Sequence, residues 1–497
     1  MWHYDCSLLL NKISQTDQLD QKNQKYQIAL DNRELKPPKR NLGAEKLRVI
    51  FISGLISLAL IATIILTLPL TVLTLSGLFV YSSIVSLVIF LFVLLIRYFA
   101  ILFMAYFYNT KYTVQKKEGY YPFVSIIVPV YNEGLVLKQS IDSLLEIDYP
   151  NYEIIIVNDG STDNTSEVGE SLVGNQRGLS GLVKVSLINK PNGGKAKALN
   201  AGIQYSEAQF VLCMDGDSQL TPNSLRMAVR HFIDPSVGAV AGNVKVQNRK
   251  KILTDLQALE YLEGLNMARS AQGFIQMVNI IPGPIGVFRK SALRDAGFYS
   301  SDTFAEDADV TLKILAHGWR IIYEPNSIAY TEAPISIYQL LKQRYRWTRG
   351  ILQAIRKHKQ YLYNPTMNFN NSIILWTMFY EALLWPAMNI FVNLYFIIIA
   401  IFYGLSSFIF LWWIGIAVLD LMSALYCVAA EKEEFRLVPY AIIYRIVFIL
   451  LIDVTKAMAT VEEFLGVQMT WGKLERTGFG PAPDSNSKAA KGSLSPQ

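Results

Sequence analysis

The sequence predicts a two-part protein, in which an α/β domain on a mostly parallel sheet is joined to an α-helical transmembrane bundle. Hydrophobic residues make up 52% of the 497 positions and charged residues only 17%, which is a small charged share for a soluble protein. The apolar residues gather in long blocks at both ends of the chain. Between these blocks, short β-rich runs alternate with helical patterns, as they do in parallel sheets with crossover helices.

The first apolar block follows a polar segment, residues 1–47, which we expect to be a disordered cytoplasmic tail. A membrane helix needs about 20 apolar residues, so residues 48–107 predict two transmembrane helices, at 49–74 and 78–106. Basic residues precede and follow this pair. The positive-inside rule therefore places the N-terminus and the next domain in the cytoplasm.

Residues 120–335 have the composition of a globular α/β domain. Four apolar runs each end in polar or glycine residues and precede a helical pattern, which predicts parallel strands. After Val244 the alternation of strands and helices gives way to a long helix-like run around Leu253–Gln272. We expect this second half of the domain to hold an acceptor substrate, and the first half to hold a nucleotide. The predicted strands are Phe123–Val130, Glu153–Val157, Val183–Ile188 and Gln209–Met214.

The C-terminal part returns to the membrane. Residues 336–360 alternate basic with apolar and aromatic residues and predict an amphipathic interfacial helix. Residues 373–460 predict two or three membrane spans, because Arg445, Asp453 and Lys456 interrupt the last apolar block. Residues 478–497 predict a disordered tail.

Composition excludes several classes of protein. The formal charge of +6 is modest for this length, and no long basic tail suggests nucleic-acid binding. The three cysteines are far apart, which argues against a disulfide framework and favours a reducing compartment. No HExxH motif indicates zinc, and no GxGxxG or P-loop motif indicates a dinucleotide enzyme or a P-loop NTPase.

Polar motifs follow the first two predicted strands. Val128–Glu133 closes the first strand and Asn158–Asp163 closes the second. Ligands of open α/β sheets bind beyond the carboxyl ends of the strands, so Asp159 is a candidate to accept hydrogen bonds from a base or a ribose. The alternative is an ordinary turn followed by a helix cap.

Two further motifs suit a diphosphate and a cation. Lys190–Asn200 combines glycines, which let the backbone approach phosphate closely, with Lys195, which could neutralise its charge. The alternative is a surface loop with solvated lysines. Asp215 and Asp217 flank a glycine directly after an apolar strand, and they could hold Mg²⁺ or Mn²⁺. The alternative there is an acidic turn.

The last two motifs suit an acceptor. Phe304–Asp309 carries Glu306 and Asp307 at the predicted start of a helix, whose positive end should keep them ionised. An ionised carboxylate there could take a proton from an attacking hydroxyl; routine acidic enrichment of a first helical turn is the alternative. Gln343–Trp347 offers arginine for phosphate and tryptophan for sugar stacking, unless it only anchors an interfacial helix.

Together and in this order, the motifs resemble the processive family-2 glycosyltransferases: cellulose, chitin, hyaluronan and especially bacterial poly-N-acetylglucosamine synthases. The resemblance covers residues 49–460 and is densest over 122–350. It implies a GT-A fold, inversion at the anomeric carbon and no covalent intermediate. Two details depart from it: Ala305 stands where many members have threonine, and Thr348–Gly350 differs from the best-known poly-N-acetylglucosamine synthases. The PilZ module of bacterial cellulose synthases has no counterpart.

The resemblance also implies a role for each candidate residue. Asp307 would be the general base. The donor nucleotide would contact Asp159, Lys195 and Asp215, while Asp217, helped by Asp215, would hold Mg²⁺ or Mn²⁺. Gln343, Arg346 and Trp347 would close over the diphosphate and the end of the acceptor. The loop Pro282–Gly286, with Gly283, would line the acceptor pocket.

The predicted function is transfer of a sugar from UDP-N-acetylglucosamine or UDP-glucose to a growing β-linked polysaccharide. The predicted partners are the UDP-sugar, the glycan acceptor, the lipid bilayer and an accessory subunit for polymer export, and no nucleic acid. We expect a multi-pass protein of the plasma or inner membrane, with its catalytic domain in the cytoplasm. Two alternatives remain: a non-processive enzyme that glycosylates a lipid, and a catalytically inactive membrane scaffold.

Overall fold

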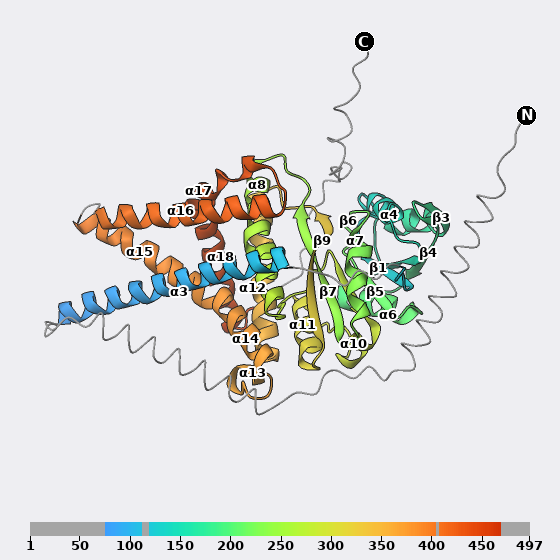
Figure 1. Ribbon diagram of the computed structural model, residues 1–497, viewed down its shortest axis with the longest axis horizontal. Helices are drawn as coiled ribbons and strands as arrows, with labels where there is room; N and C mark the ends of the chain where they lie inside the picture. The colour runs from blue at the N-terminus through green and yellow to red at the C-terminus, as the bar shows by residue number, and fades with distance from the viewer. Residues whose placement is uncertain (1–74, 112–118, 404–406, 469–497) are drawn as a thin grey trace, which may run out of the picture.

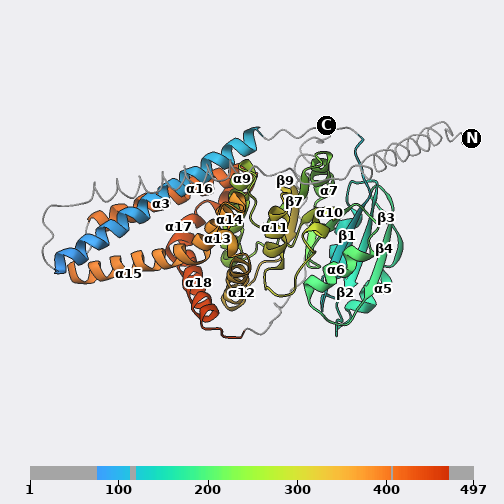
Figure 2. The same ribbon diagram turned by 90° about the horizontal axis from the view of Figure 1, so that it is seen from below.

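The computed structural model describes residues 75–111, 119–403 and 407–468. The predicted tails at 1–47 and 478–497 and the predicted first helix at 49–74 lie outside the described residues. An α/β domain occupies one side of the molecule, and long helices extend from its other side (Figures 1 and 2). This is the two-part organisation that the sequence predicts.

A single nine-stranded mixed sheet forms the α/β domain, with the strand order β3-β4-β2-β1-β5-β8-β7-β9-β6. Strands β4, β2, β1 and β5 run parallel to one another, and the four strands predicted from the sequence are these four. The nine strands are β1 Val124–Val130, β2 Tyr152–Asn158, β3 Gly174–Gly178, β4 Gly181–Asn189, β5 Phe210–Cys213, β6 Ser218–Leu220, β7 Val237–Val246, β8 Gly286–Arg289 and β9 Arg320–Thr331.

The inner strands are buried along their whole length, because helices cover both faces of a parallel sheet. Every residue of β1, β2, β5 and β7 is buried. The register pairs Val130 of β1 with Asn158 of β2, and Asn158 with Asn189 of β4. These three strands therefore end at the same level, and the polar residues that follow them meet along one edge of the sheet.

The helices of this domain follow the alternating pattern of the chain. Those after the parallel strands are short, and the run predicted around Leu253–Gln272 is an α-helix, a π-helical segment and a second α-helix. They are α4 Leu137–Leu145, α5 Thr165–Ser171, α6 Lys195–Tyr205, α7 Ser224–Val229, η1 Arg230–Ile233, α8 Ile252–Glu260, η2 Tyr261–Met267, α9 Ala268–Phe274, α10 Lys290–Asp295 and α11 Glu306–Ala316.

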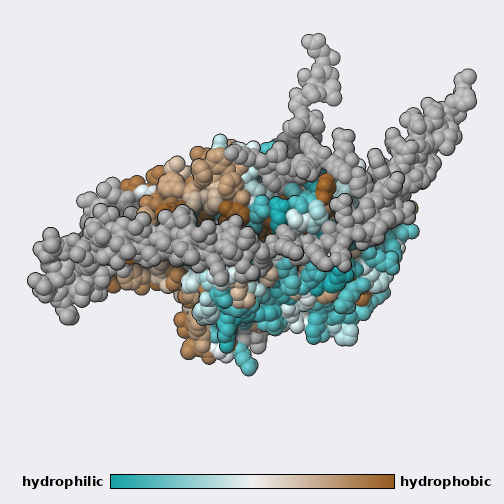
Figure 3. Space-filling model, turned by 60° about the horizontal axis from the view of Figure 1, so that its bottom comes forward, coloured by the Kyte–Doolittle hydropathy of each residue, from teal (hydrophilic) through white to brown (hydrophobic). Residues whose placement is uncertain are grey.

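Four helical segments within the described residues are long and apolar enough to cross a membrane: Val88–Thr110, Phe369–Ile398, Trp413–Ala430 and Phe435–Phe464. Each of them exposes large hydrophobic side chains. On the face shown in Figure 3, hydrophobic residues gather at the helical end, whereas the α/β domain is mostly hydrophilic. The elements are α3 Leu75–Lys111, α14 Phe369–Phe379, η3 Tyr380–Leu384, α15 Trp385–Tyr403, α16 Ser407–Ala430, η4 Phe435–Leu437, α17 Tyr440–Ile443, η5 Tyr444–Phe448 and α18 Ile449–Phe464.

Helix α12, Ile337–Lys357, connects the two parts, and the short α13, Gln360–Tyr363, follows it. Ser336 caps its N-terminus by accepting a hydrogen bond from the backbone N–H of Gln339. The predicted amphipathic helix is thus present, but its central polar residues are buried, because α12 packs against α11, α14 and α18. It lies between the sheet and the candidate membrane helices (Figure 2).

Candidate active site

Asp159 lies at the end of β2 and organises the glycine-rich loop after β4. Its carboxylate accepts hydrogen bonds from the backbone N–H groups of Gly193 and Gly194, at 3.0 and 2.7 Å. Lys190 donates to the same carboxylate. Gly194 has a φ of +88°, which favours glycine. Asp159 therefore fixes the loop from which α6 begins, and contact with a nucleotide base stays a prediction.

Lys195 begins α6 and joins three motifs that are far apart in the sequence. Its Nζ lies 2.7 Å from Oδ1 of Asp215 and 2.9 Å from Oε1 of Glu306. Burial alone would lower the pKa of Lys195, but the carboxylates of Asp215, Glu306 and Asp307 raise this pKa well above its ordinary value. The side chain therefore stays cationic, as a group that neutralises a diphosphate must.

Gly283 closes this cluster from the predicted acceptor loop. A Cβ on Gly283 would lie 2.9 Å from both Oδ2 of Asp215 and Nζ of Lys195. The same small cavity is lined by Lys195, Asp215, Gly283 and Asp307. The structure thus brings together four of the residues that the sequence singled out, and it adds Glu306 as the second partner of Lys195.

Asp307 lies in the first turn of α11 and accepts a hydrogen bond of 2.8 Å from the N–H of Ala308. The sequence predicted that the helix terminus would keep this carboxylate ionised. Burial opposes this effect and raises the pKa of Asp307 to about 6, with a further contribution from Glu306, while Lys195 lowers it. A carboxylate with this pKa is mostly ionised at neutral pH and is still basic enough to accept a proton.

This pKa predicts the pH dependence of transfer. Asp307 acts as a base only when it is ionised, so kcat/KM should be half-maximal at a pH of about 6 and level off about one pH unit above it. Below that pH it should fall, roughly tenfold for each pH unit as the base becomes protonated. The measurement is a pH profile of kcat/KM between pH 4.5 and 8.5. A profile that stays flat down to pH 4.5 would contradict the assignment.

Asp309, two residues after Asp307, ties α11 to the end of α12. Its Oδ1 lies 2.9 Å from Nε2 of His358 and 3.0 Å from Nζ of Lys357, and its side chain is fully buried. Burial alone would raise the pKa of Asp309, but His358, Lys313 and Lys357 hold it below its ordinary value. Asp309 therefore stays charged and fixes the helix that carries the base.

Asp309→Ala should lower the free energy of unfolding by about 3–5 kcal/mol, because it removes a fully buried carboxylate that Lys313, Lys357 and the buried His358 all contact. The matched control is Asp302→Ala, since Asp302 also pairs with Lys357 but its side chain is 61% exposed. That control should change stability by less than about 1 kcal/mol. Thermal or denaturant unfolding in detergent would measure both, and equal effects would contradict a structural role for Asp309.

Helix α12 also packs directly against the base motif. A Cβ on Gly350 would lie 2.7 Å from the backbone N of Ala305 and 2.8 Å from its Cβ. In addition, the N–H of Phe304 donates to Oε1 of Gln353, at 3.1 Å. One face of α12 therefore holds the two residues that precede Glu306 and Asp307.

Gly350→Ala should displace this motif, because the clash is with backbone atoms that cannot move separately from the start of α11. We expect about 1–3 kcal/mol of lost stability and a reduced kcat. Donor affinity should change little, because Gly350 does not contact Lys195 or Asp215. Matched unfolding curves and kinetics of the variant would test this, and an unchanged kcat would contradict it.

The Gln343–Trp347 motif lies on α12. The sequence singled out Arg346 of this motif, but in the structure it is Arg344 that lines a cavity together with Trp347. Arg344 makes a two-pronged ion pair with Glu260, with one contact of 3.0 Å, and its guanidinium lies 4.2 Å from the centre of the Trp347 ring. Arg344 also donates to Oε1 of the buried Gln343. Arg344 and Trp347 line a cavity of 290 Å³, whereas Gln343 and Arg346 are not among its lining residues.

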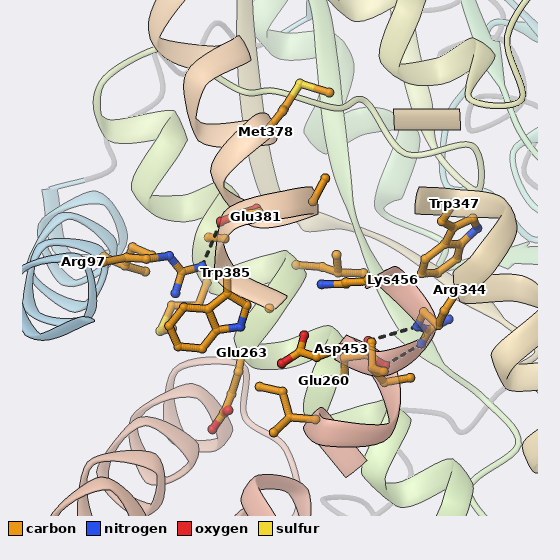
Figure 4. Close-up of a pocket in the computed structure, with 18 of the residues that line it drawn as sticks. Arg97, Glu260, Glu263, Arg344, Trp347, Met378, Glu381, Trp385, Asp453 and Lys456 are labelled. Carbon is orange, nitrogen blue, oxygen red and sulfur yellow. Dashed lines mark hydrogen bonds and ion pairs between the residues drawn. The ribbon is translucent and has the colours of Figure 1, made fainter. Parts of the chain in front are cut away.

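This cavity extends from Trp347 in among the candidate membrane helices (Figure 4). Its charged residues include Arg97, which pairs with Glu381 at 2.8 Å. All three π-helical segments of the described residues, η2, η3 and η5, contribute to its wall. Because π-helical turns occur often at functional sites, the cavity is a candidate binding site next to the base motif.

Two cavities meet at one short segment. Asn279 and Ile280 line the large cavity, and Ile281 to Gly283 line the small one with Lys195 and Asp307. The loop predicted to contact the acceptor therefore separates the two cavities.

Asp217 is buried, and its neighbours differ from those of Asp215. Its charge acts on Tyr261, which packs beside Trp347, whereas Asp215 pairs with Lys195. A Cβ on Gly216 would lie 2.1 Å from Oε2 of Glu133, so a third carboxylate packs over the motif. Sequence reasoning quoted Glu133 within the first motif but gave it no role.

The described residues contain no group of three or more histidine, cysteine, aspartate or glutamate side chains arranged to hold a metal. Mg²⁺ is commonly held by only one or two carboxylates together with substrate phosphates. The pair Asp215 and Asp217 fits that mode of binding, and it does not fit an all-protein cage.

The mixed sheet, with its polar residues gathered at the carboxyl ends of the parallel strands, defines a domain of GT-A type. Residues 125–296 match the family model described as Glycosyl transferase family 2, so this part of the chain is a family-2 glycosyltransferase domain. The family predicted from the sequence motifs is confirmed.

The chain is 33% identical over 244 residues to a poly-beta-1,6-N-acetyl-D-glucosamine synthase of Staphylococcus epidermidis and 34% identical over 257 residues to one of Staphylococcus aureus. Each alignment covers 49% of this chain, and they cover 58% and 60% of those relatives. The chain thus spans about three fifths of the length of the curated relatives that it matches.

Among solved structures, a mannosyltransferase from Pyrobaculum calidifontis in complex with GDP-Man and Mn²⁺ aligns with a TM-score of 0.53 and 21% identity. The alignment covers 76% of this chain and 98% of that chain. This likeness shows a shared GT-A fold.

Proposed function

We propose that this protein transfers N-acetylglucosamine from UDP-N-acetylglucosamine to a growing β-linked polysaccharide at a membrane, with inversion at the anomeric carbon. UDP-glucose is the second candidate donor. The observation that supports the proposal is the adjacency of two cavities along residues 279–283. Lys195, which could neutralise a diphosphate, lines the small cavity together with Asp307, and the 290 Å³ cavity that contains Trp347 begins at the adjoining residues Asn279 and Ile280. The matched synthases favour the same sugar.

The donor would bind at the carboxyl ends of the parallel strands. Asp159 holds the glycine-rich loop in place, and Lys195 would neutralise the diphosphate once it displaces the contacts with Asp215 and Glu306. Asp217, with Asp215, would hold Mg²⁺ or Mn²⁺, which when bound would neutralise the leaving diphosphate.

The acceptor would enter from the large cavity. Asp307 takes the proton of the acceptor hydroxyl while the hydroxyl oxygen forms a bond to C1 of the donor sugar. At the same time, the bond between C1 and the diphosphate oxygen breaks, and UDP leaves with the bonding electron pair. A single displacement of this kind inverts C1. Trp347 offers a stacking face for the acceptor sugar.

Membrane association is supported by the four candidate spans. We infer that they are transmembrane, with the glycosyltransferase domain in the cytoplasm at a plasma or inner membrane, because basic residues flank the first apolar block. The cavity among these helices would then receive the polymer as it grows, and an accessory subunit could assist its export.

A labelled-donor assay tests this function. Purified protein in lipid would be incubated with labelled UDP-N-acetylglucosamine or UDP-glucose and Mg²⁺, and the products would be sized. We expect long polymer from UDP-N-acetylglucosamine and less from UDP-glucose. A single sugar on a lipid would instead support the lipid-acceptor alternative. No turnover of any UDP-sugar would contradict the proposal and favour an inactive scaffold.

A further inference from the structure

The large cavity contains four arginines, and three of them have carboxylate partners. Arg97 pairs with Glu381, Arg344 with Glu260 and Arg445 with Asp420, and the first two pairs are visible in Figure 4. The fourth, Arg269 of α9, has no ion pair with any described residue. It differs from the others in this respect although it lines the same cavity.

Arg269 is also buried. Its side chain is only 7% exposed, and Nη1 is buried without a hydrogen-bond partner among the described residues. A buried guanidinium without a partner costs several kcal/mol of desolvation free energy. Its missing acceptors must be supplied by a ligand or by ordered water.

The position of Arg269 relates it to the reaction. Its charge interacts with Asp307 and with Tyr261, which packs beside Trp347. Arg269 lines the large cavity together with Asn279 and Ile280, and the chain continues from these residues to Ile281–Gly283, which line the small cavity with Asp307. A group held by Arg269 would be near the hydroxyl that Asp307 deprotonates.

The lining of the cavity indicates the class of ligand. It contains five cationic side chains, the four arginines and Lys456, and five carboxylates, so its formal charge is zero. Trp347 and Trp385 add aromatic faces. A neutral, oxygen-rich ligand with flat apolar faces, such as a sugar chain, suits this lining better than an anion.

We propose that Arg269 binds the acceptor, donating hydrogen bonds to oxygen atoms of its terminal sugar and holding the attacking hydroxyl beside Asp307. This role rests on the proposed function. The guanidinium offers several donors in a rigid fork, so it can grip two sugar oxygens at once. The interaction fixes the orientation of the acceptor and contributes nothing to donor binding.

The test compares Arg269→Met with wild type in lipid, using β-linked N-acetylglucosamine oligosaccharides as acceptors. Loss of a charged hydrogen bond should raise the acceptor KM on the order of 10- to 100-fold. Donor affinity and slow donor hydrolysis by water should be unchanged. Arg226→Met is the matched control, because Arg226 is a surface residue that pairs with Asp148, and it should behave like wild type.

Two further measurements separate acceptor binding from a structural role. Arg269→Lys keeps the charge but loses the fork, so its acceptor KM should lie between those of wild type and Arg269→Met. Removing the cation near Asp307 should move the acid limb of the kcat/KM profile to higher pH in Arg269→Met, and Arg269→Lys should leave it in place. If Arg269→Met also loses donor affinity, the acceptor KM of Arg269→Lys decides whether Arg269 binds the acceptor.

The outcomes are distinguishable from those of the proposed function. If wild type makes no polymer from any UDP-sugar, the proposed function fails. If wild type makes polymer and both Arg269 variants have the acceptor KM of Arg226→Met, the assignment of Arg269 fails while the function stands.

Discussion

Asp307→Asn should abolish sugar transfer while the variant still binds the donor. Asparagine has nearly the shape of aspartate but cannot accept the proton, and loss of a general base costs on the order of 10²- to 10⁴-fold in rate. The Ala308 N–H can still donate to the amide oxygen at this position, so the first turn of α11 should persist.

The measurement is single-turnover transfer together with donor binding by calorimetry. Asp142→Asn is the control, because Asp142 is an exposed residue of α4 that pairs with Lys138. We expect the control to match wild type in both assays. Transfer at more than about a tenth of the wild-type rate in Asp307→Asn would refute the base assignment.

Lys195→Met should have the second largest effect. The change removes the cation from between Asp215 and Glu306. These two carboxylates and that of Asp307 then share one small cavity without a cation. The developing charge on the diphosphate would lose one fixed partner, which typically costs about 10²- to 10³-fold in kcat. Donor affinity should fall as well.

A second signature follows from the pKa of Asp307. Lys195 lowers this pKa, so its removal should raise the pKa above about 6. The acid limb of the pH profile should then move to higher pH. Lys195→Arg keeps the charge and should retain most of the wild-type limb. An acid limb that does not move in Lys195→Met would show that the two groups do not interact in the working enzyme.

The edge of the sheet could be predicted because it depends on local patterns. Apolar runs ending in Asn158-Asp159 and Met214-Asp215 predict strands, and the carboxyl ends of parallel strands meet at one edge. The structure confirms these strands and the common edge. Asp159 could be placed at this edge, but its three hydrogen bonds to the loop after β4 depend on how two distant segments pack.

Contacts between distant segments account for most of what sequence reasoning missed. Lys195 and Glu306 are 111 positions apart, and nothing in either motif indicates that they form an ion pair. Arg344 was not singled out, because its role depends on Glu260, on a helix that no motif marks. The π-helical segments give no periodicity that differs clearly from that of an α-helix, so the cavity they line could not be predicted.

The contact between α12 and the C-terminal helix α18 could not be predicted either, because it joins segments that are far apart in the sequence. Arg349 of α12 pairs with Glu463 at the end of α18, at 2.6 Å, and Gln353 contacts the same carboxylate at 3.3 Å. Arg349 appeared in the sequence only as a departure from related synthases. In the structure it links the last described helix to the helix that holds the base motif.

A structure of the protein in lipid with UDP-N-acetylglucosamine and Mg²⁺ tests the account most directly. It should show the diphosphate against Lys195, the cation against Asp217, and C1 of the sugar facing the space between Asp307 and Trp347. A donor bound elsewhere, with Asp307 and Lys195 contacting no part of it, would contradict the account.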